Sequence, residues 1–68
     1  GENMLPESVR ERVVKEQNEL RDKITKLALF VYSAKIETVD EKQARLLKAQ
    51  LRVMEEYNDI LTERLEAN

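Results

Sequence analysis

The feature that most constrains the fold of this chain is the stretch over residues 9–32, VRERVVKEQNELRDKITKLALFVY. Apolar residues recur through it at helical spacing, with Gln17 as the one polar member, and this pattern predicts a single long amphipathic helix. The stripe consists of Val9, Val13, Leu20, Ile24, Leu27 and Val31, and Val14 widens it. Over residues 27–32 the chain reads LALFVY, which is apolar on every side of a helix. One partner helix covers only part of that turn, so we expect a second copy of the chain to bury the rest.

A second long helix is predicted over residues 40–66. Its main apolar seam consists of Ala44, Leu47, Leu51, Met54, Asn58, Leu61 and Leu65, of which Asn58 is polar. A second apolar line lies beside this seam at a spacing of seven residues and consists of Leu46, Val53 and Ile60. Two seams on one helix predict two partners, which are the first helix and a neighbouring chain. Asn58 is expected to cost stability unless it is paired.

The break between the helices is short, SAKIETV over residues 33–39, so we expect the helices to be antiparallel neighbours. Two alternative caps precede the second helix. Thr38 with Glu41 forms a capping box, and Asp40 with Gln43 offers the same arrangement two residues later.

The start of the first helix also has two interpretations. Pro6 suits the first turn of a helix, whereas Ser8 with Glu11 forms a capping box. A short lead-in helix that bends into the long one would satisfy both. We expect residues 1–3, which stand ahead of Met4, to be a cloning remnant.

The predicted fold class is therefore all-α. Two long antiparallel helices, over about residues 9–32 and 40–66, follow a short N-terminal lead-in helix, and the chain assembles as a helical homo-oligomer. Residues 1–68 form a single helical-hairpin domain.

Composition argues against several classes of function. Histidine and cysteine are absent, which removes the commonest general base, the commonest zinc ligand and any disulfide, and a single glycine leaves no phosphate-binding loop. We therefore expect no enzyme, no cofactor and no metal. Charged residues make up 38% of the chain with a net charge of −2, which argues against a duplex-DNA binder. No apolar run approaches the roughly 20 residues of a membrane span, so we expect a cytoplasmic protein.

For charged and aromatic residues outside the seams, we favour a structural interpretation over a functional one. The i,i+4 pairs on the outer face of the first helix are typical of a solvated surface; they are Arg12–Glu16, Lys15–Glu19 and Asp22–Lys26. Tyr32 and Tyr57 are expected in the core with their hydroxyls at its edge, and Tyr57 more so. The functional alternative is a platform on which a nucleobase stacks.

Three residues beside the seams are candidates for binding phosphate, namely Lys23, Thr25 and Arg64. Lysine and arginine suit phosphate oxygens, and threonine supplies a small donor and acceptor. The structural interpretation, which spacing alone favours, is pairing with nearby carboxylates: Lys23 with Glu19, and Arg64 with Asp59 or Glu63.

Two segments resemble a known family. They are ERVVKEQNELRDKITKL over residues 11–27 and LL-x-x-Q-L-x-x-M-x-x-Y-x-x-I-L-x-x-R-L over residues 46–65. This order of residues resembles the bacteriophage anti-CBASS nucleotide sponges, which sequester the cyclic oligonucleotide messengers of bacterial immunity without cleaving them. The resemblance implies a helical protomer in a compact homohexamer. It also implies separate sites between protomers for cyclic dinucleotides, such as cyclic GMP-AMP, and for cyclic trinucleotides.

By position, the resemblance assigns the dinucleotide-site lysine to Lys23, and the trinucleotide-site threonine and arginine to Thr25 and Arg64. The family can also place a stacking aromatic ring and an asparagine at the start of the first helix. Ser8 and Val9 stand there in this chain, so we expect weaker dinucleotide binding unless Leu5, Pro6 or another residue supplies the stacking surface.

The functional hypothesis from the sequence is thus a sponge in the cytoplasm of the infected bacterial host, with no membrane or DNA partner. Two alternatives explain the same helices. One is a helical-hairpin module for protein–protein interaction or assembly with no small-molecule ligand. The other is a small hairpin that binds nucleic acid.

Overall fold

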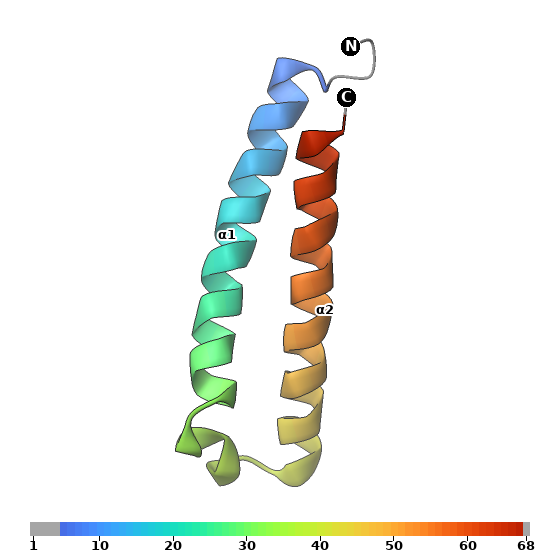
Figure 1. Ribbon diagram of the computed structural model, residues 1–68. Coiled ribbons are helices and arrows are strands. Elements are labelled where there is room, and N and C mark those ends of the chain that lie inside the picture. Colours follow the sequence, from blue (N-terminus) through green and yellow to red (C-terminus); the bar gives the residue numbers. More distant parts are fainter. Residues whose placement is uncertain (1–4, 68) are drawn as a thin grey trace.

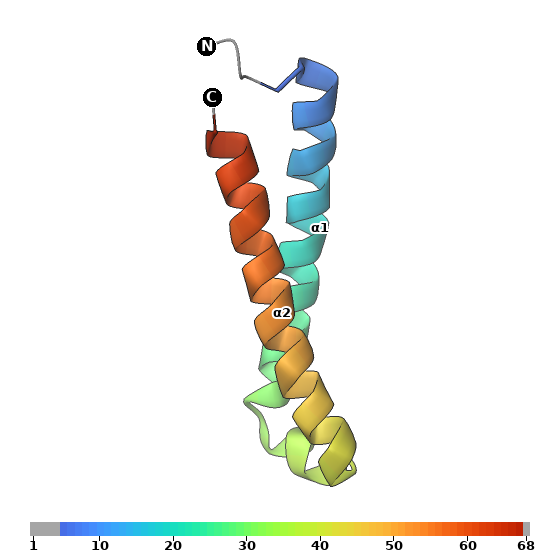
Figure 2. The same cartoon turned by 90° about the vertical axis from the view of Figure 1, so that its right-hand side faces the viewer.

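The computed structural model describes residues 5–67 as a hairpin of two long helices. Helix α1 (Glu7–Val31) and helix α2 (Glu41–Glu66) are joined by the short 3-10 helix η1 (Ala34–Thr38). The two long helices run antiparallel and side by side (Figure 1), and the second view shows that they cross at an inclination (Figure 2). The predicted all-α hairpin is confirmed, and the helices begin and end within two residues of the expected positions.

The start of α1 differs from the prediction. Pro6 is the N-cap residue, and its carbonyl accepts from the backbone N–H groups of Val9 and Arg10 at 3.0 and 2.9 Å. Ser8 lies inside the first helical turn, so the capping box at Ser8 is wrong. In residues 5–67 no separate lead-in helix precedes α1, because the helix continues unbroken from Glu7. Met4 lies outside the described residues.

At the start of α2, the second of the two capping alternatives is confirmed. The Asp40 carboxylate accepts from the backbone N–H of Gln43 at 3.2 Å. The first alternative is wrong, because the Thr38 hydroxyl donates backwards to the Lys35 carbonyl at 2.6 Å and closes η1 instead. A side-chain oxygen at the N-cap satisfies one of the N–H groups that a helix start leaves without a partner.

The hydrophobic core runs along the contact between α1 and α2. Its buried members all belong to the two predicted seams and are Val13, Leu20, Val31, Leu51 and Leu61. Leu61 is 0% exposed. Partly buried residues from the same seams pack against the core, namely Val9, Ile24, Met54 and Leu65. The helical periodicity of the sequence thus identifies the faces that meet.

The polar members of the two seams meet each other inside this core. Gln17 is 5% exposed, and its amide nitrogen Nε2 lies 2.7 Å from Thr62 Oγ1, 3.2 Å from Asn58 Oδ1 and 3.3 Å from the Asn58 carbonyl oxygen. Buried polar groups need such partners, and within residues 5–67 no buried side-chain nitrogen or oxygen lacks one. The pairing that Asn58 was expected to need is therefore present.

The start of α1 is tied to the end of α2 by a further long-range hydrogen bond. The Arg10 guanidinium donates to the Leu65 carbonyl at 2.8 Å. The last carbonyls of a helix lack partners within the helix and carry its partial negative charge, so a cation is favourable there.

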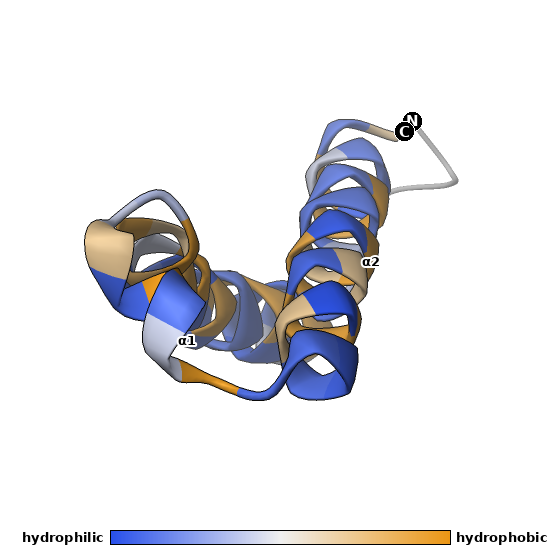
Figure 3. Ribbon diagram, turned by 90° about the horizontal axis from the view of Figure 1, so that it is seen from below, coloured by the Kyte–Doolittle hydropathy of each residue, from blue (hydrophilic) through white to orange (hydrophobic). Residues whose placement is uncertain are grey.

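Hydrophobic residues are not confined to the core, and the end-on view shows them distributed along both helices and in the connection (Figure 3). Val31 is buried, but Leu29 and Tyr32 from the same turn are exposed, Tyr32 to 80%. The expectation that the hairpin leaves part of the LALFVY turn uncovered is confirmed. Over residues 5–67, neither helix has the length and apolar character to cross a membrane.

Candidate ligand-binding site

The candidate residues divide between the two long flanks along which α1 and α2 meet. One flank, here called the Arg64 flank, carries a hollow of about 300 Å³ lined by Val9, Arg12, Val13, Glu16 and Arg64. Seven residues make about two helical turns, so Lys23 lies on the same side of α1 as Glu16. The structure therefore brings Val9 and Arg64 together and places Lys23 farther along the same flank.

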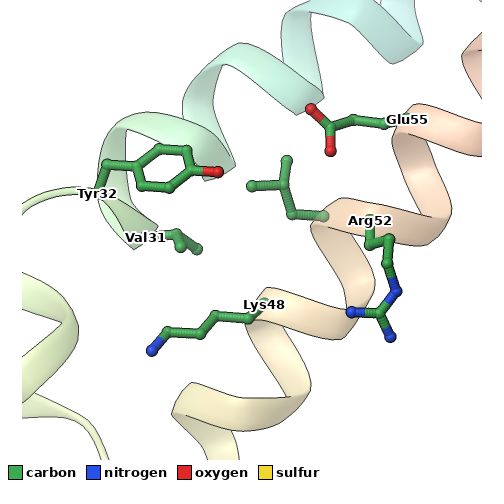
Figure 4. A pocket seen from close by; sticks show the side chains of 6 residues that line it. Val31, Tyr32, Lys48, Arg52 and Glu55 are labelled. Atoms are coloured by element: carbon green, nitrogen blue, oxygen red, sulfur yellow. The ribbon is translucent and has the colours of Figure 1, made fainter.

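The opposite flank, here called the Tyr32 flank, carries a larger hollow of about 520 Å³ (Figure 4). Its lining residues are Val31, Tyr32, Lys48, Leu51, Arg52 and Glu55. In Figure 4 the Tyr32 hydroxyl and the Glu55 carboxylate extend into the space between the helices, while the charged ends of Lys48 and Arg52 extend from α2 away from them. An apolar floor, an exposed aromatic ring and two cations are features of sites that bind nucleotides.

Thr25 lies on the Tyr32 flank, because it precedes Tyr32 by seven residues. Its hydroxyl donates to the Arg21 carbonyl at 3.0 Å, which leaves the oxygen able to accept a further hydrogen bond. Thr25 and Arg64 thus occupy opposite flanks of one hairpin. A site that uses both of them requires residues from two chains.

Lys23 and Arg64 are exposed and do not form the carboxylate pairs that spacing favoured. The one ion pair within residues 5–67 joins Lys26 Nζ to Asp22 Oδ2 at 3.0 Å. The other two expected pairs, Arg12–Glu16 and Lys15–Glu19, do not form. In both of these the base precedes the acid, which is the weaker orientation on a helix.

Ser8 is exposed in the first turn of α1, next to Val9 at the edge of the Arg64 hollow. The expectation that the tyrosines are core residues is wrong for this hairpin. Tyr32 is exposed, and Tyr57 is exposed on the outer part of α2. Both rings are open to contact with a ligand or with another chain.

Several residues around the hollows were missed by the sequence reasoning. Arg12 and Glu16 border Arg64, and Lys48, Arg52 and Glu55 border Tyr32. Lys48, Arg52 and Glu55 are separated by four and then by three residues, and this spacing does indicate one face of α2. Nothing in the sequence alone indicates which residues of α1 stand opposite them.

These features define a class: a small helical hairpin that leaves apolar surface uncovered and carries, on each flank, a hollow lined by two cations and one carboxylate. Comparison with protein families matches residues 7–67 to the family described as Sequestin. The match covers most of the chain, so the chain belongs to the Sequestin family. The family's name fits the sequestering proteins that residues 11–27 and 46–65 resemble, and it indicates binding rather than catalysis. Neither the curated proteins nor the solved structures contain a match to this chain.

Proposed function

We propose that this protein is a bacteriophage sponge that binds cyclic di- and trinucleotide messengers of CBASS-type immunity and sequesters them uncleaved. The observation that carries the proposal is membership of the Sequestin family over residues 7–67. It acts in the cytoplasm of the infected bacterium, as a homohexamer with ligand sites between protomers.

The cations of the Arg64 flank support this proposal. Arg64 and Arg12 line one hollow, and Lys23 stands two turns beyond Glu16 on the same flank. None of the three cations is held in an ion pair within residues 5–67. Unpaired cations beside an apolar surface suit a ligand that carries phosphate groups and flat purine rings.

The division of Thr25 and Arg64 between opposite flanks supports sites that two chains share. In this proposal Lys23 binds a phosphate of the cyclic dinucleotide, once from each of two chains. Thr25 from one chain and Arg64 from another bind the cyclic trinucleotide, and Ser8 and Val9 border the ligand at the start of α1.

The test is calorimetric titration with cyclic GMP-AMP and cyclic tri-AMP. Lys23→Ala is expected to weaken dinucleotide binding, and Arg64→Ala to weaken trinucleotide binding. Each variant should lose about 1.5–3 kcal/mol of binding free energy for its nucleotide, because a charge-assisted contact to phosphate is removed. Matched controls are Lys15→Ala and Arg45→Ala, which remove the same side-chain types from exposed positions on the outer faces of the helices.

Unchanged affinity in both site variants would remove these residue assignments. Failure of the wild-type protein to bind either nucleotide would refute the proposed ligand class. Sequestration is checked by heating the complex and measuring the mass of the released nucleotide by mass spectrometry. The nucleotide should be intact. A cleaved product would show that the protein is an enzyme and does not act by sequestration.

The uncovered apolar residues of α2 favour a second candidate, a protein–protein interaction module without a small-molecule ligand. Thermal stability separates the two candidates. A sponge gains about 2.7 kcal/mol of stability at a hundredfold excess of ligand over Kd, whereas the melting temperature of an interaction module does not respond to nucleotide.

A further inference from the structure

The second apolar line of α2 remains uncovered in the hairpin. Leu46, Val53 and Ile60 are between 47% and 58% exposed, although they follow one another at two-turn intervals along one side of the helix. Tyr57, one turn from both Val53 and Ile60, is also exposed. These four residues are named the α2 stripe. Such a stripe adds nothing to the stability of a monomer in water, because its side chains stay exposed. An exposed apolar stripe is typical of a protein–protein interface.

The three aliphatic residues of the α2 stripe match themselves when the direction of the helix is reversed. Val53 lies midway between Leu46 and Ile60. An antiparallel pair of α2 helices therefore places Val53 beside Val53 of the partner subunit, and Leu46 beside Ile60 of the partner subunit. The seven-residue spacing keeps all three side chains on the contact line over several turns. A twofold axis generates this arrangement from one surface, and it is the commonest symmetry of homo-oligomers.

Charges beside the α2 stripe favour the reversed direction. Lys42 and Glu63 stand on the same side of it, because a multiple of seven residues separates them. Antiparallel pairing brings Lys42 toward Glu63 of the partner subunit at both ends of the contact. Parallel pairing would bring lysine to lysine and glutamate to glutamate, which is unfavourable. Arg64 is level with Lys42 of the partner subunit in this register, but it stands on the opposite side of the stripe from Lys42 and Glu63.

We infer that α2 packs antiparallel against α2 of a second copy through the α2 stripe, about a twofold axis near Val53. The inference rests on the homo-oligomer of the proposed function and specifies one of its interfaces. The hairpin buries five hydrophobic side chains within residues 5–67, and a domain of this size gains from the additional burial. The Tyr32 flank, where Lys48 and Arg52 project, lies on the other side of α2 and stays open in the pair.

Cross-linking of single-cysteine variants tests the inference. The 68-residue sequence has no cysteine, so each substitution introduces a single thiol into it. With a short bismaleimide, Val53→Cys is expected to lose its monomer band to a covalent dimer. Leu46→Cys and Ile60→Cys are each expected to stay largely monomeric alone, whereas a mixture of the two, with one carrying a mass tag, gives the mixed dimer. Lys48→Cys is the matched control, since it is exposed on the other side of α2.

Two results would overturn the inference. One is a Val53→Cys variant that forms no more dimer than Lys48→Cys. The other is efficient self-linking of both Leu46→Cys and Ile60→Cys, which indicates a parallel pair. All substituted positions are exposed, and the helical circular dichroism signal checks that each variant is folded. Because no nucleotide is added, failed cross-linking with intact nucleotide binding removes only the interface, and the reverse outcome removes only the proposed ligand.

Discussion

Replacing Gln17 with leucine tests how the two helices hold their register. The substitution keeps a side chain of similar size in a site that is 5% exposed and removes the donor that serves Asn58 and Thr62. The amide has two hydrogens, so three close acceptors amount to no more than two full hydrogen bonds. At about 1 kcal/mol net for each bond, the loss is about 2 kcal/mol.

Burial of the leucine returns part of this loss, because each additional buried methylene contributes about 0.8 kcal/mol. We therefore expect Gln17→Leu to lower the free energy of unfolding by about 1 kcal/mol. Adding Asn58→Leu removes the amide that the first change left without its donor. Replacement of both partners by apolar groups is close to neutral or stabilising, so the double variant should recover the wild-type value.

The assay is urea unfolding followed by circular dichroism at several protein concentrations, since the stability of an oligomer depends on concentration. Asn18→Leu is the matched control; it changes the adjacent exposed amide and should shift stability by less than about 0.5 kcal/mol. A Gln17→Leu variant as stable as the wild type would contradict the role given to the Gln17 amide. So would a double variant that loses the sum of the two single effects instead of recovering.

Three further predictions concern stability. Leu61→Ala should cost about 2–5 kcal/mol, because the side chain is fully buried, and a thermal melt that shifts by only a degree or two would contradict this. Asp40→Ala should cost about 0.5–2 kcal/mol in urea unfolding, and more than Thr38→Ala, since Asp40 caps α2; equal losses would reject the cap. Lys26→Gln should cost no more than about 0.5 kcal/mol at low salt, and the difference should shrink in high salt; a larger loss would mean that the exposed Asp22–Lys26 pair contributes more than its geometry suggests.

The residues proposed to bind phosphate illustrate what resemblance and geometry each contribute. Lys23, Thr25 and Arg64 come from matching the sequence to a family, and the structure neither pairs them with carboxylates nor gathers them in one chain. The division of Thr25 and Arg64 between flanks follows from counting turns along α1 and from the hollow that contains Arg64. A hypothesis that Thr25 and Arg64 contact the same ligand is therefore a hypothesis about an assembly.

The polar seam members show a similar division. The sequence marks Gln17 and Asn58 as exceptions in otherwise apolar stripes, which predicts that each needs a partner. It does not indicate that they are each other's partners, or that Thr62 joins them. That result depends on the offset between α1 and α2, which the long-range hydrogen bonds of Gln17 and of Arg10 mark along the hairpin.

By itself the sequence determined the two helices, the faces they bury and the excess of apolar surface. Helix formation and amphipathicity are local properties with a period of about 3.6 residues, so they can be counted along the chain. Only the tertiary structure decided that Arg64 shares a hollow with Val9 and Arg12, and that Tyr32 shares one with Lys48 and Arg52. These neighbours are set by the register of one helix against the other. That register depends on side-chain packing between residues far apart in sequence, and periodicity carries no information about it.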